Sequence, residues 1–202
     1  MGSLKSYINI TERKEDGTNP RKVAVIAFGR FQPPTRGHMK IVDKVKEVAG
    51  QKGGNALIFP SQSHDLKGRN PLEWNEKIQL MRELMPNTTI VQNPKAKNAW
   101  SALEVLEEEG YTEVYMVCGS DRVAEYERRW LPYATEAFEH AEVISAGSRD
   151  PDDEVGVQGM SGTRAREAAA EGDLGKFRAA TGWTGSAADK LMAAVKKGLP
   201  GE

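Results

Sequence analysis

Residues 23–38 read VAVIAFGRFQPPTRGH, an almost unbroken apolar run that passes into a turn rich in glycine and proline. A continuous apolar run is typical of a parallel strand that is covered on both faces. A segment of helical periodicity follows the turn. We therefore predict a buried strand over residues 23–28 and a helix that begins near His38. Because a helix N-terminus attracts anions, this junction by itself predicts a phosphate-binding turn.

Strands and helices alternate along the rest of the chain. Further strands are predicted at residues 56–60, 89–92, 113–118 and 141–146. Between them, apolar residues recur at helical spacing. This alternation predicts an α/β fold with a Rossmann-like, doubly wound parallel sheet of about five strands, whose ligands bind outside the carboxyl ends of the strands.

The domain organisation follows from length and polarity. Residues 1–21 are polar and mixed in charge, and we expect them to form an N-terminal arm. Residues 22–202 are expected to form one domain with C-terminal helices from about residue 161. The last amphipathic stretch carries Ala188 and Leu191, and its apolar stripe is expected to pack on the domain, with another subunit as the alternative.

The bulk composition excludes several classes of protein. A net charge of −1 gives no electrostatic footprint for nucleic acid or an anionic membrane. No apolar stretch approaches the ~20 residues of a membrane-spanning helix, and no secretory segment opens the chain. Cys118 is the only cysteine, so an intramolecular disulfide is impossible. We therefore expect a cytoplasmic protein that binds neither nucleic acid nor a membrane, and a homo-oligomer stays open.

Two polar stretches resemble a pair of known signatures. The first is GRFQPPTRGH at residues 29–38, and the second reads SGTRAR from Ser161. In this order they resemble the G-R-F-Q-P…[H/T]-x-G-H and [ST]-[SGA]-T-x-x-R signatures of the nucleotidylyltransferase superfamily. Its members transfer a nucleotidyl group from a nucleoside triphosphate to a phosphate-bearing acceptor. The resemblance therefore implies this reaction, with Mg²⁺ as the partner of the triphosphate.

Intermediate stretches narrow the resemblance to the archaeal-type nicotinamide-mononucleotide adenylyltransferases. The stretch SQSH contains Ser63 and His64, and NPL begins at Asn70; they are similar to that family's S-A-Q-x-S-H and [DN]-P-F-T segments. Trp100 falls where the family has an N-A-x-W-type stretch whose tryptophan stacks on nicotinamide. The resemblance implies ATP and nicotinamide mononucleotide as substrates. These four residues would face the acceptor, or the first three would only hold their loop.

Other readings of the same stretches stay open. Thr35 replaces the first histidine of the signature, as in the pantetheine-phosphate branch of the superfamily. A cytidylyltransferase or a pantetheine-phosphate adenylyltransferase is therefore an alternative. A non-catalytic nucleotide-binding or assembly protein that has kept the fold is the alternative from another class. An acidic, insertion-like loop at residues 150–154 precedes the second signature.

The first stretch offers five residues to a nucleotide. His38 is expected to donate a hydrogen bond to the α-phosphate as charge builds during transfer, with a helix-capping or surface histidine as the alternative. Gly29 would let the backbone approach phosphate, and Gly37 belongs to the same turn. Arg30 could clamp phosphate or form a surface salt bridge. Thr35 could bind the triphosphate or cap the helix.

The second stretch begins a predicted helix. Ser161 and Thr163 flank Gly162 at its N-terminus, where either hydroxyl could cap the helix or bind phosphate. Arg164 and Arg166 add two positive charges beside them. Together these residues predict a cradle for the β- and γ-phosphates.

Each of four further residues has two possible roles. Phe31 and Gln32 are expected to shape the loop or to contact base and ribose. Trp100 could stack on a flat acceptor ring or pack as an ordinary helix aromatic. Asp121, after the fourth predicted strand, could bind a ribose of the acceptor or cap the following helix.

Overall fold

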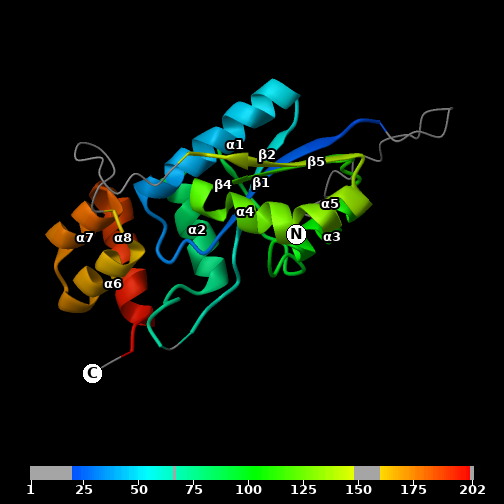
Figure 1. Cartoon of the computed structure of the whole chain (residues 1–202). Helices are drawn as coiled ribbons and strands as arrows, with labels where there is room; N and C mark the ends of the chain where they lie inside the picture. Colours follow the sequence, from blue (N-terminus) through cyan, green and yellow to red (C-terminus); the bar gives the residue numbers. More distant parts are fainter. Residues whose placement is uncertain (1–19, 66, 148–159, 201–202) are drawn as a thin grey trace, which may run out of the picture.

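The computed structural model describes residues 20–65, 67–147 and 160–200 of the chain. Its centre is a five-stranded parallel sheet with the strand order β3-β2-β1-β4-β5 (Figure 1). The strands are β1 (Val23–Gly29), β2 (Asn55–Pro60), β3 (Thr89–Ile90), β4 (Glu113–Cys118) and β5 (His140–Ser145). The predicted doubly wound, Rossmann-like sheet is confirmed, and only β3 is clearly shorter than expected.

Helices connect and cover the strands. They are η1 (Arg36–His38), α1 (Met39–Lys52), α2 (Trp74–Leu84), α3 (Ser101–Glu108), α4 (Ser120–Arg129), α5 (Leu131–Ala137), α6 (Gly162–Glu171), α7 (Leu174–Thr181) and α8 (Gly185–Gly198). None of the helices in the described ranges is long and apolar enough to cross a membrane. The acidic loop at residues 150–154 and nearly all of the expected N-terminal arm lie outside the described residues.

The sheet separates two apolar cores, which explains why β1 is apolar at every position. Val25 points to the core that contains Val42 of α1, together with α2 and the C-terminal helices. Its neighbour Ile26 points to the opposite core, with Leu103 of α3 and Trp130 between α4 and α5. Successive side chains of a strand face opposite ways, so a strand covered on both faces needs apolar residues throughout.

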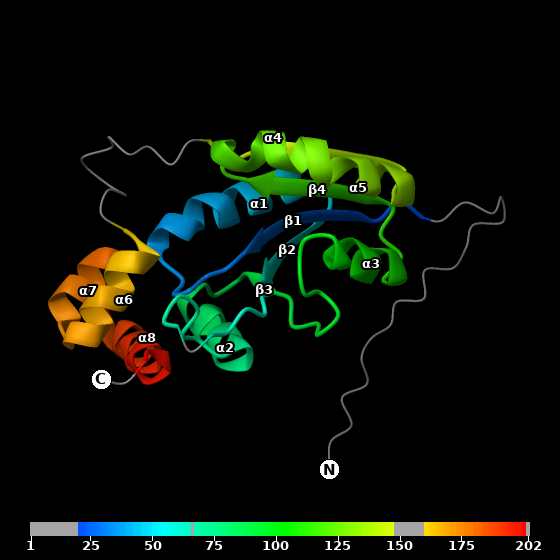
Figure 2. The ribbon, with the colours of Figure 1, turned by 60° about the horizontal axis from the view of Figure 1, so that its bottom comes forward.

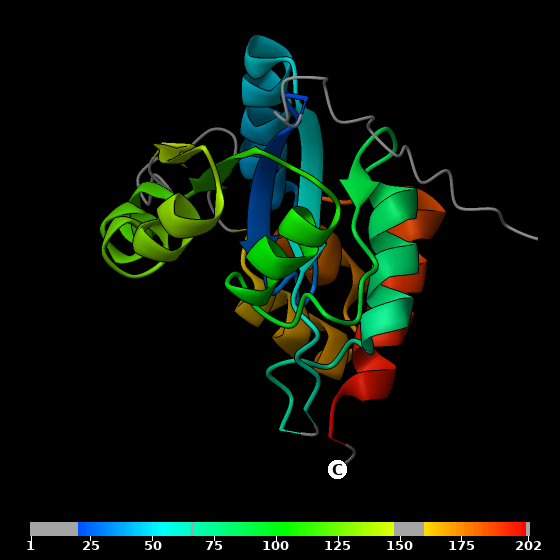
Figure 3. The same ribbon diagram turned by 90° about the vertical axis from the view of Figure 1, so that its right-hand side faces the viewer.

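The C-terminal helices gather at the end of the sheet where the strands terminate. Figure 2 shows α6, α7 and α8 together beside α2 and the first turns of α1. Helix α8 runs alongside α2 (Figure 3) and also contacts α6. Leu191 and Val195 of α8 are fully buried, so the expected packing of this stretch on the domain is confirmed.

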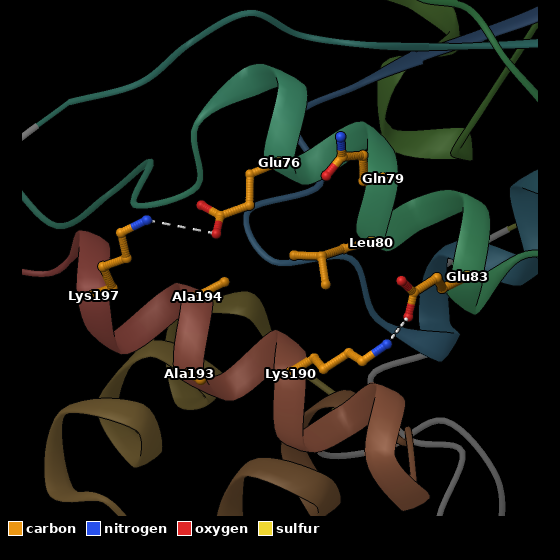
Figure 4. A pocket seen from close by; sticks show the side chains of 8 residues that line it. All are labelled: Glu76, Gln79, Leu80, Glu83, Lys190, Ala193, Ala194 and Lys197. Carbon is orange, nitrogen blue, oxygen red and sulfur yellow. Dashed lines mark hydrogen bonds and ion pairs between the residues drawn. The ribbon is translucent and has the colours of Figure 1, made fainter.

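The contact between α2 and α8 is partly open to solvent. Leu80 lies between the two helices, and ion pairs bridge them on either side (Figure 4). Lys190 is 2.8 Å from Glu83, and Lys197 is 3.8 Å from Glu76. Exposed ion pairs contribute little stability. The buried apolar side chains therefore supply most of the attachment of α8.

One backbone approach in this region is very close. A Cβ atom built on Gly198, the last residue of α8, would lie 1.9 Å from the carbonyl oxygen of Pro71. Pro71 belongs to the connection that leads into α2. Only glycine leaves room for this contact, which fixes the end of α8 against the loop that follows β2.

Candidate functional site

Two connections meet at the carboxyl ends of the central strands. We call residues 29–38, after β1, the first loop, and residues 61–73, after β2, the second loop. The backbone N–H of Ser61 donates to the carbonyl of Gly29 at 2.8 Å and so extends the pairing of the two strands into the loops. A parallel sheet binds ligands at this edge, so these loops form the natural candidate site.

Gln32 joins the first loop to the second. Its side-chain Nε2 donates to the carbonyls of Ser63 and Leu72, both at 2.9 Å. Its Oε1 accepts the backbone N–H of Leu72, also at 2.9 Å. The residue is only 5% exposed. Of the two predicted roles, the structure therefore places Gln32 in shaping the loop.

Phe31 occupies an uncommon backbone conformation for a residue with a side chain, with φ at 49°. Its ring lies over Gly29, where an added Cβ would be 2.8 Å from Cε2 of the ring. The same ring stands 4.8 Å from the imidazole of His38, centroid to centroid. Gly29 is thus required because a larger residue would displace Phe31, and Phe31 in turn supports His38.

Thr35 determines which nitrogen of His38 carries the proton. The backbone N–H of Thr35 donates to Nδ1 of His38 at 3.0 Å, and the Thr35 hydroxyl lies 2.9 Å from the same nitrogen. A ring nitrogen that accepts an N–H cannot itself be protonated, so the proton of the neutral ring resides on Nε2. Thr35 is 3% exposed, and both of these contacts orient the His38 ring. His38 therefore has Nε2–H as its donor group.

The second signature stretch, residues 161–166, lies against the first loop, although the two are far apart in the sequence. Arg166 donates from one guanidinium nitrogen to the carbonyl of Gln32 at 2.7 Å and from the other to the Thr163 hydroxyl at 3.1 Å. Gly162 also approaches this carbonyl, since a Cβ at this position would be 3.2 Å from the oxygen. The two predicted phosphate-binding stretches thus meet across 134 residues of sequence.

Ser161 is the N-cap of α6. Its hydroxyl oxygen accepts the backbone N–H groups of Thr163 at 3.2 Å and Arg164 at 3.5 Å. Its own N–H donates to Ala180 of α7 at 2.9 Å. The capping alternative for Ser161 therefore holds, while Thr163 and Arg164 are exposed at the same helix end.

Positive charges converge on this part of the molecule. Burial, followed by the nearby charge of Arg30, lowers the pKa of the Arg166 guanidinium, and Arg69 of the second loop acts in the same direction. The repulsion between such like charges is relieved when an anion binds between them. Arg69 was not expected from the sequence, because it stands in a loop outside both signatures.

Two residues that the sequence did not suggest support the first loop. Lys77 of α2 is fully buried and donates to the carbonyl of Arg30 at 2.9 Å. Trp183, between α7 and α8, donates its indole N–H to the carbonyl of Pro34 at 3.1 Å. The guanidinium of Arg36 lies 5.7 Å from the Trp183 ring centroid. The loop is thus held both by α2 and by the C-terminal helices.

The side chains of two predicted acceptor residues, His64 and Asn70, make contacts within the second loop. His64 has its Nε2 3.4 Å from a carboxylate oxygen of Glu73. The side-chain amide of Asn70 donates to Asp65, and the other oxygen of that carboxylate accepts backbone N–H groups of the same loop. Ser63 is exposed. These residues stand at the sheet edge beside the first loop.

Trp100 lies elsewhere. Its indole N–H donates to the carbonyl of Arg129, the last residue of α4, at 3.1 Å. Asp121 stands in the first turn of α4, close to the end of β4. A ten-residue helix spans about 15 Å, so the two residues are at opposite ends of α4. The structure therefore brings Asp121 to the edge of the candidate site and does not bring Trp100 there.

The fold and the converging loops define a Rossmann-like α/β protein whose ligand site lies at the carboxyl edge of the sheet. The sequence model described as cytidylyltransferase-like matches residues 26–168. The chain therefore belongs to the cytidylyltransferase-like family, within the nucleotidyltransferase superfamily. The predicted resemblance is confirmed at this level, and the archaeal-type branch stays a prediction.

The remaining comparisons concern individual proteins. No curated protein matches the chain. A solved structure of a Vibrio parahaemolyticus protein, described as a putative nicotinate-nucleotide adenylyltransferase, matches with a TM-score of 0.55 and 16% identity. The match covers 85% of this chain and 99% of that one. At this identity the likeness shows a shared fold.

Proposed function

We propose that the protein is a Mg²⁺-dependent nucleotidylyltransferase that forms NAD⁺ and pyrophosphate from ATP and nicotinamide mononucleotide. The observation that carries the proposal is the contact of Arg166 with the Gln32 carbonyl, which joins the two stretches predicted to hold one triphosphate. Family membership supports the reaction class. The choice of acceptor rests on the resemblance of the second-loop sequence to the nicotinamide-mononucleotide adenylyltransferases.

The proposed reaction needs no general base. A phosphate oxygen of the acceptor attacks the α-phosphorus of ATP, the bond from that phosphorus to the bridging oxygen breaks, and pyrophosphate leaves with the electron pair. The acceptor phosphate is already anionic at neutral pH. Catalysis then depends on holding the reactants in line and on stabilising charge at the α-phosphate and the leaving group.

The residues of the site have the groups that this reaction requires. Nε2–H of His38 would donate to an α-phosphate oxygen, where a donor stabilises the charge that develops during transfer. Arg30 and Arg166 would bind the β- and γ-phosphates, because guanidinium groups bind phosphate oxygens bidentately. Bound Mg²⁺ would neutralise part of the triphosphate charge, held mainly by phosphate oxygens and water.

The acceptor would lie on the second-loop side of the site. Ser63, His64 and Asn70 line this side of the sheet edge, and Asp121 stands at the first turn of α4. Trp100 is left out of the proposed site, because its indole is anchored to the far end of α4. An aromatic partner for the acceptor ring is therefore not part of the proposal.

The test is an assay of pyrophosphate release over a grid of substrates. ATP and CTP would each be combined with nicotinamide mononucleotide, nicotinate mononucleotide, phosphopantetheine and glycerol 3-phosphate. We expect the highest kcat/KM for ATP with nicotinamide mononucleotide. A maximum for CTP with the phosphorylated alcohol would instead indicate a cytidylyltransferase. Tight nucleotide binding with no pyrophosphate from any pair would support the non-catalytic alternative.

A further inference from the structure

A fully buried lysine lies beneath the two loops of the site. Lys77 is 0% exposed, although it belongs to α2, a helix with a solvent-facing side. Its Nζ donates to the carbonyl of Arg30 in the first loop at 2.9 Å and to the carbonyl of Ser61 in the second loop at 2.5 Å. One side chain thus bridges the two connections that form the candidate site.

Burial of the Lys77 amine costs free energy, because the charged form loses its contact with water. Desolvation lowers the pKa of Lys77 to about 7, and no carboxylate in the described part of the chain offsets the effect. An apolar side chain of similar size would fill the same space without the cost of removing an amine from water. The partners of Lys77 are backbone carbonyls in two different loops, and these bonds are what an apolar side chain could not replace.

We propose that Lys77 is a positioning residue that fixes the first and second loops in one relative arrangement. The inference rests on the proposed function, because it assigns the two loops to the two substrates of one reaction. The first loop carries Arg30 and His38 on the triphosphate side, and the second carries the acceptor side. Lys77 therefore sets the distance between the attacking phosphate and the group that it attacks. Misplacement of such groups by about 1 Å can cost 100-fold in rate.

Lys77 adds side-chain contacts beside the backbone hydrogen bond from Ser61 N–H to the Gly29 carbonyl, which joins the loops at the strand ends at 2.8 Å. Gln32 ties the first loop to both ends of the second loop, at Ser63 and at Leu72. The Lys77 contacts are made close to the strand ends, one residue beyond each strand. Loss of the ammonium or amine donors would release both carbonyls of Arg30 and Ser61 at once.

The direct test measures the loops in the absence of substrate. Amide hydrogen exchange of residues 29–38 and 61–70 would be followed by mass spectrometry in the wild type, Lys77→Met and Lys77→Arg. Lys77→Met removes the donors and retains much of the volume, so both loops should exchange about tenfold faster. Lys77→Arg retains the donors and should restore protection. Lys190→Met, which removes an exposed lysine paired with α2, is the matched control and should change neither loop.

The results separate this inference from the proposed reaction. Unchanged exchange in both loops of a folded Lys77→Met protein would overturn the inference, whichever substrates the protein uses. Equal loosening in Lys77→Arg and Lys77→Met would also overturn it, because shape rather than the donors would then hold the loops. If Lys77→Met does not fold, Lys77→Leu, which also lacks a donor, takes its place against the same outcomes.

The enzymatic readout provides a second, independent test. With the substrate pair that the grid identifies, Lys77→Met should lower kcat by about 10- to 100-fold and leave the KM values for both substrates little changed. A structural loss of folded protein would instead lower the active fraction without a change in the kinetics of the remainder. A folded variant with wild-type kcat would contradict the inference even if the loops exchange faster.

Discussion

The first loop and the start of α6 differ in how they are built, although both are expected to meet the same triphosphate. Residues 31–35 of the first loop are all buried. Gln32 within this segment and Lys77 and Trp183 beside it each donate a hydrogen bond to loop backbone. At the start of α6, Thr163 and Arg164 are exposed, and the helix end is held chiefly by its own cap.

This difference suggests a division between shape and charge. A buried, hydrogen-bonded loop holds a donor such as Nε2–H of His38 in place before the substrate binds, and such preorganisation lowers the barrier to reaction. An exposed helix end with two arginines attracts and holds an anion without a fixed position for the reacting atoms. Changes in the first loop should therefore act on kcat, and changes at α6 should act on KM.

The largest effect is expected for His38→Ala. Removal of one transition-state donor should lower kcat by about 100-fold or more, with a small change in KM. Steady-state pyrophosphate release would measure this loss. His140→Ala is the matched control, because His140 begins β5 at the opposite edge of the sheet. A His38→Ala enzyme with kcat near that of the control would remove His38 from the mechanism.

Arg166→Ala should come next and should act on binding. It removes a guanidinium from the proposed β,γ-phosphate site and also releases the Gln32 carbonyl. Because charge-assisted hydrogen bonds contribute about 1.5–3 kcal/mol, the KM for the triphosphate should rise by about 10- to 100-fold. Lys176→Ala, which removes an exposed ion pair on α7, serves as the control. An unchanged KM would mean that Arg166 supports only the first loop.

Burial of Lys77 beneath the first loop should have a smaller effect, which is a pH dependence of the free energy of unfolding. Because burial lowers the pKa of Lys77 from 10.5 to about 7, the unfolded chain binds more protons than the folded protein between these values. The cost of burying the charge is fully present below about pH 7 and falls as the pH rises. The free energy of unfolding should therefore increase above pH 7, by at most about 1.4 kcal/mol per pH unit.

Urea denaturation at about pH 7 and pH 8.5 would measure this slope. Lys77→Met should remove most of it, and Lys190→Met should retain it. The window ends below the range in which the thiol of Cys118 acts in the opposite sense, since burial raises its pKa to about 11. A wild-type slope that survives in Lys77→Met would assign it to another group.

The smallest effect is expected for Ser161→Ala. Loss of the N-cap of α6 should lower the free energy of unfolding by about 1 kcal/mol and leave kcat nearly unchanged. Ser161→Asp, which can still cap the helix, should retain stability but weaken triphosphate binding through its negative charge. If both variants have the same KM as the wild type, Ser161 does not face the triphosphate.

Much of the fold was readable from the order of apolar and polar segments. The apolar runs that became β1 and β4 predicted strands covered on both faces, and the first loop, the second loop and the turn before Asp121 each follow the end of a strand. The helix that begins after His38 and the C-terminal helices were also found where periodicity placed them. Local pattern suffices for these features, because the period of burial is a property of neighbouring residues.

The support of the site could not be read in the same way. Lys77 has the pattern of a helix residue on the apolar face, which gives no hint of two backbone carbonyls above it. Trp183 reaches a carbonyl 149 residues away, and Arg69 joins the positive cluster from an irregular loop. Trp100 was expected at the site from its neighbours in sequence, yet the long connection after β3 leads it away. Contacts of this kind depend on the packing of elements, which sequence periodicity does not encode.

The close approach of Gly198 to Pro71 makes the shape of the second loop depend on the last turn of α8. A methyl group at Gly198 would act as a wedge between α8 and the connection that carries Asn70, since no space exists for it. Under the proposed function, a substitution at the end of α8 should therefore shift acceptor selectivity and leave every residue of both signatures intact. Gly198 is thus a position outside both signatures at which the acceptor side of the proposed site can be altered.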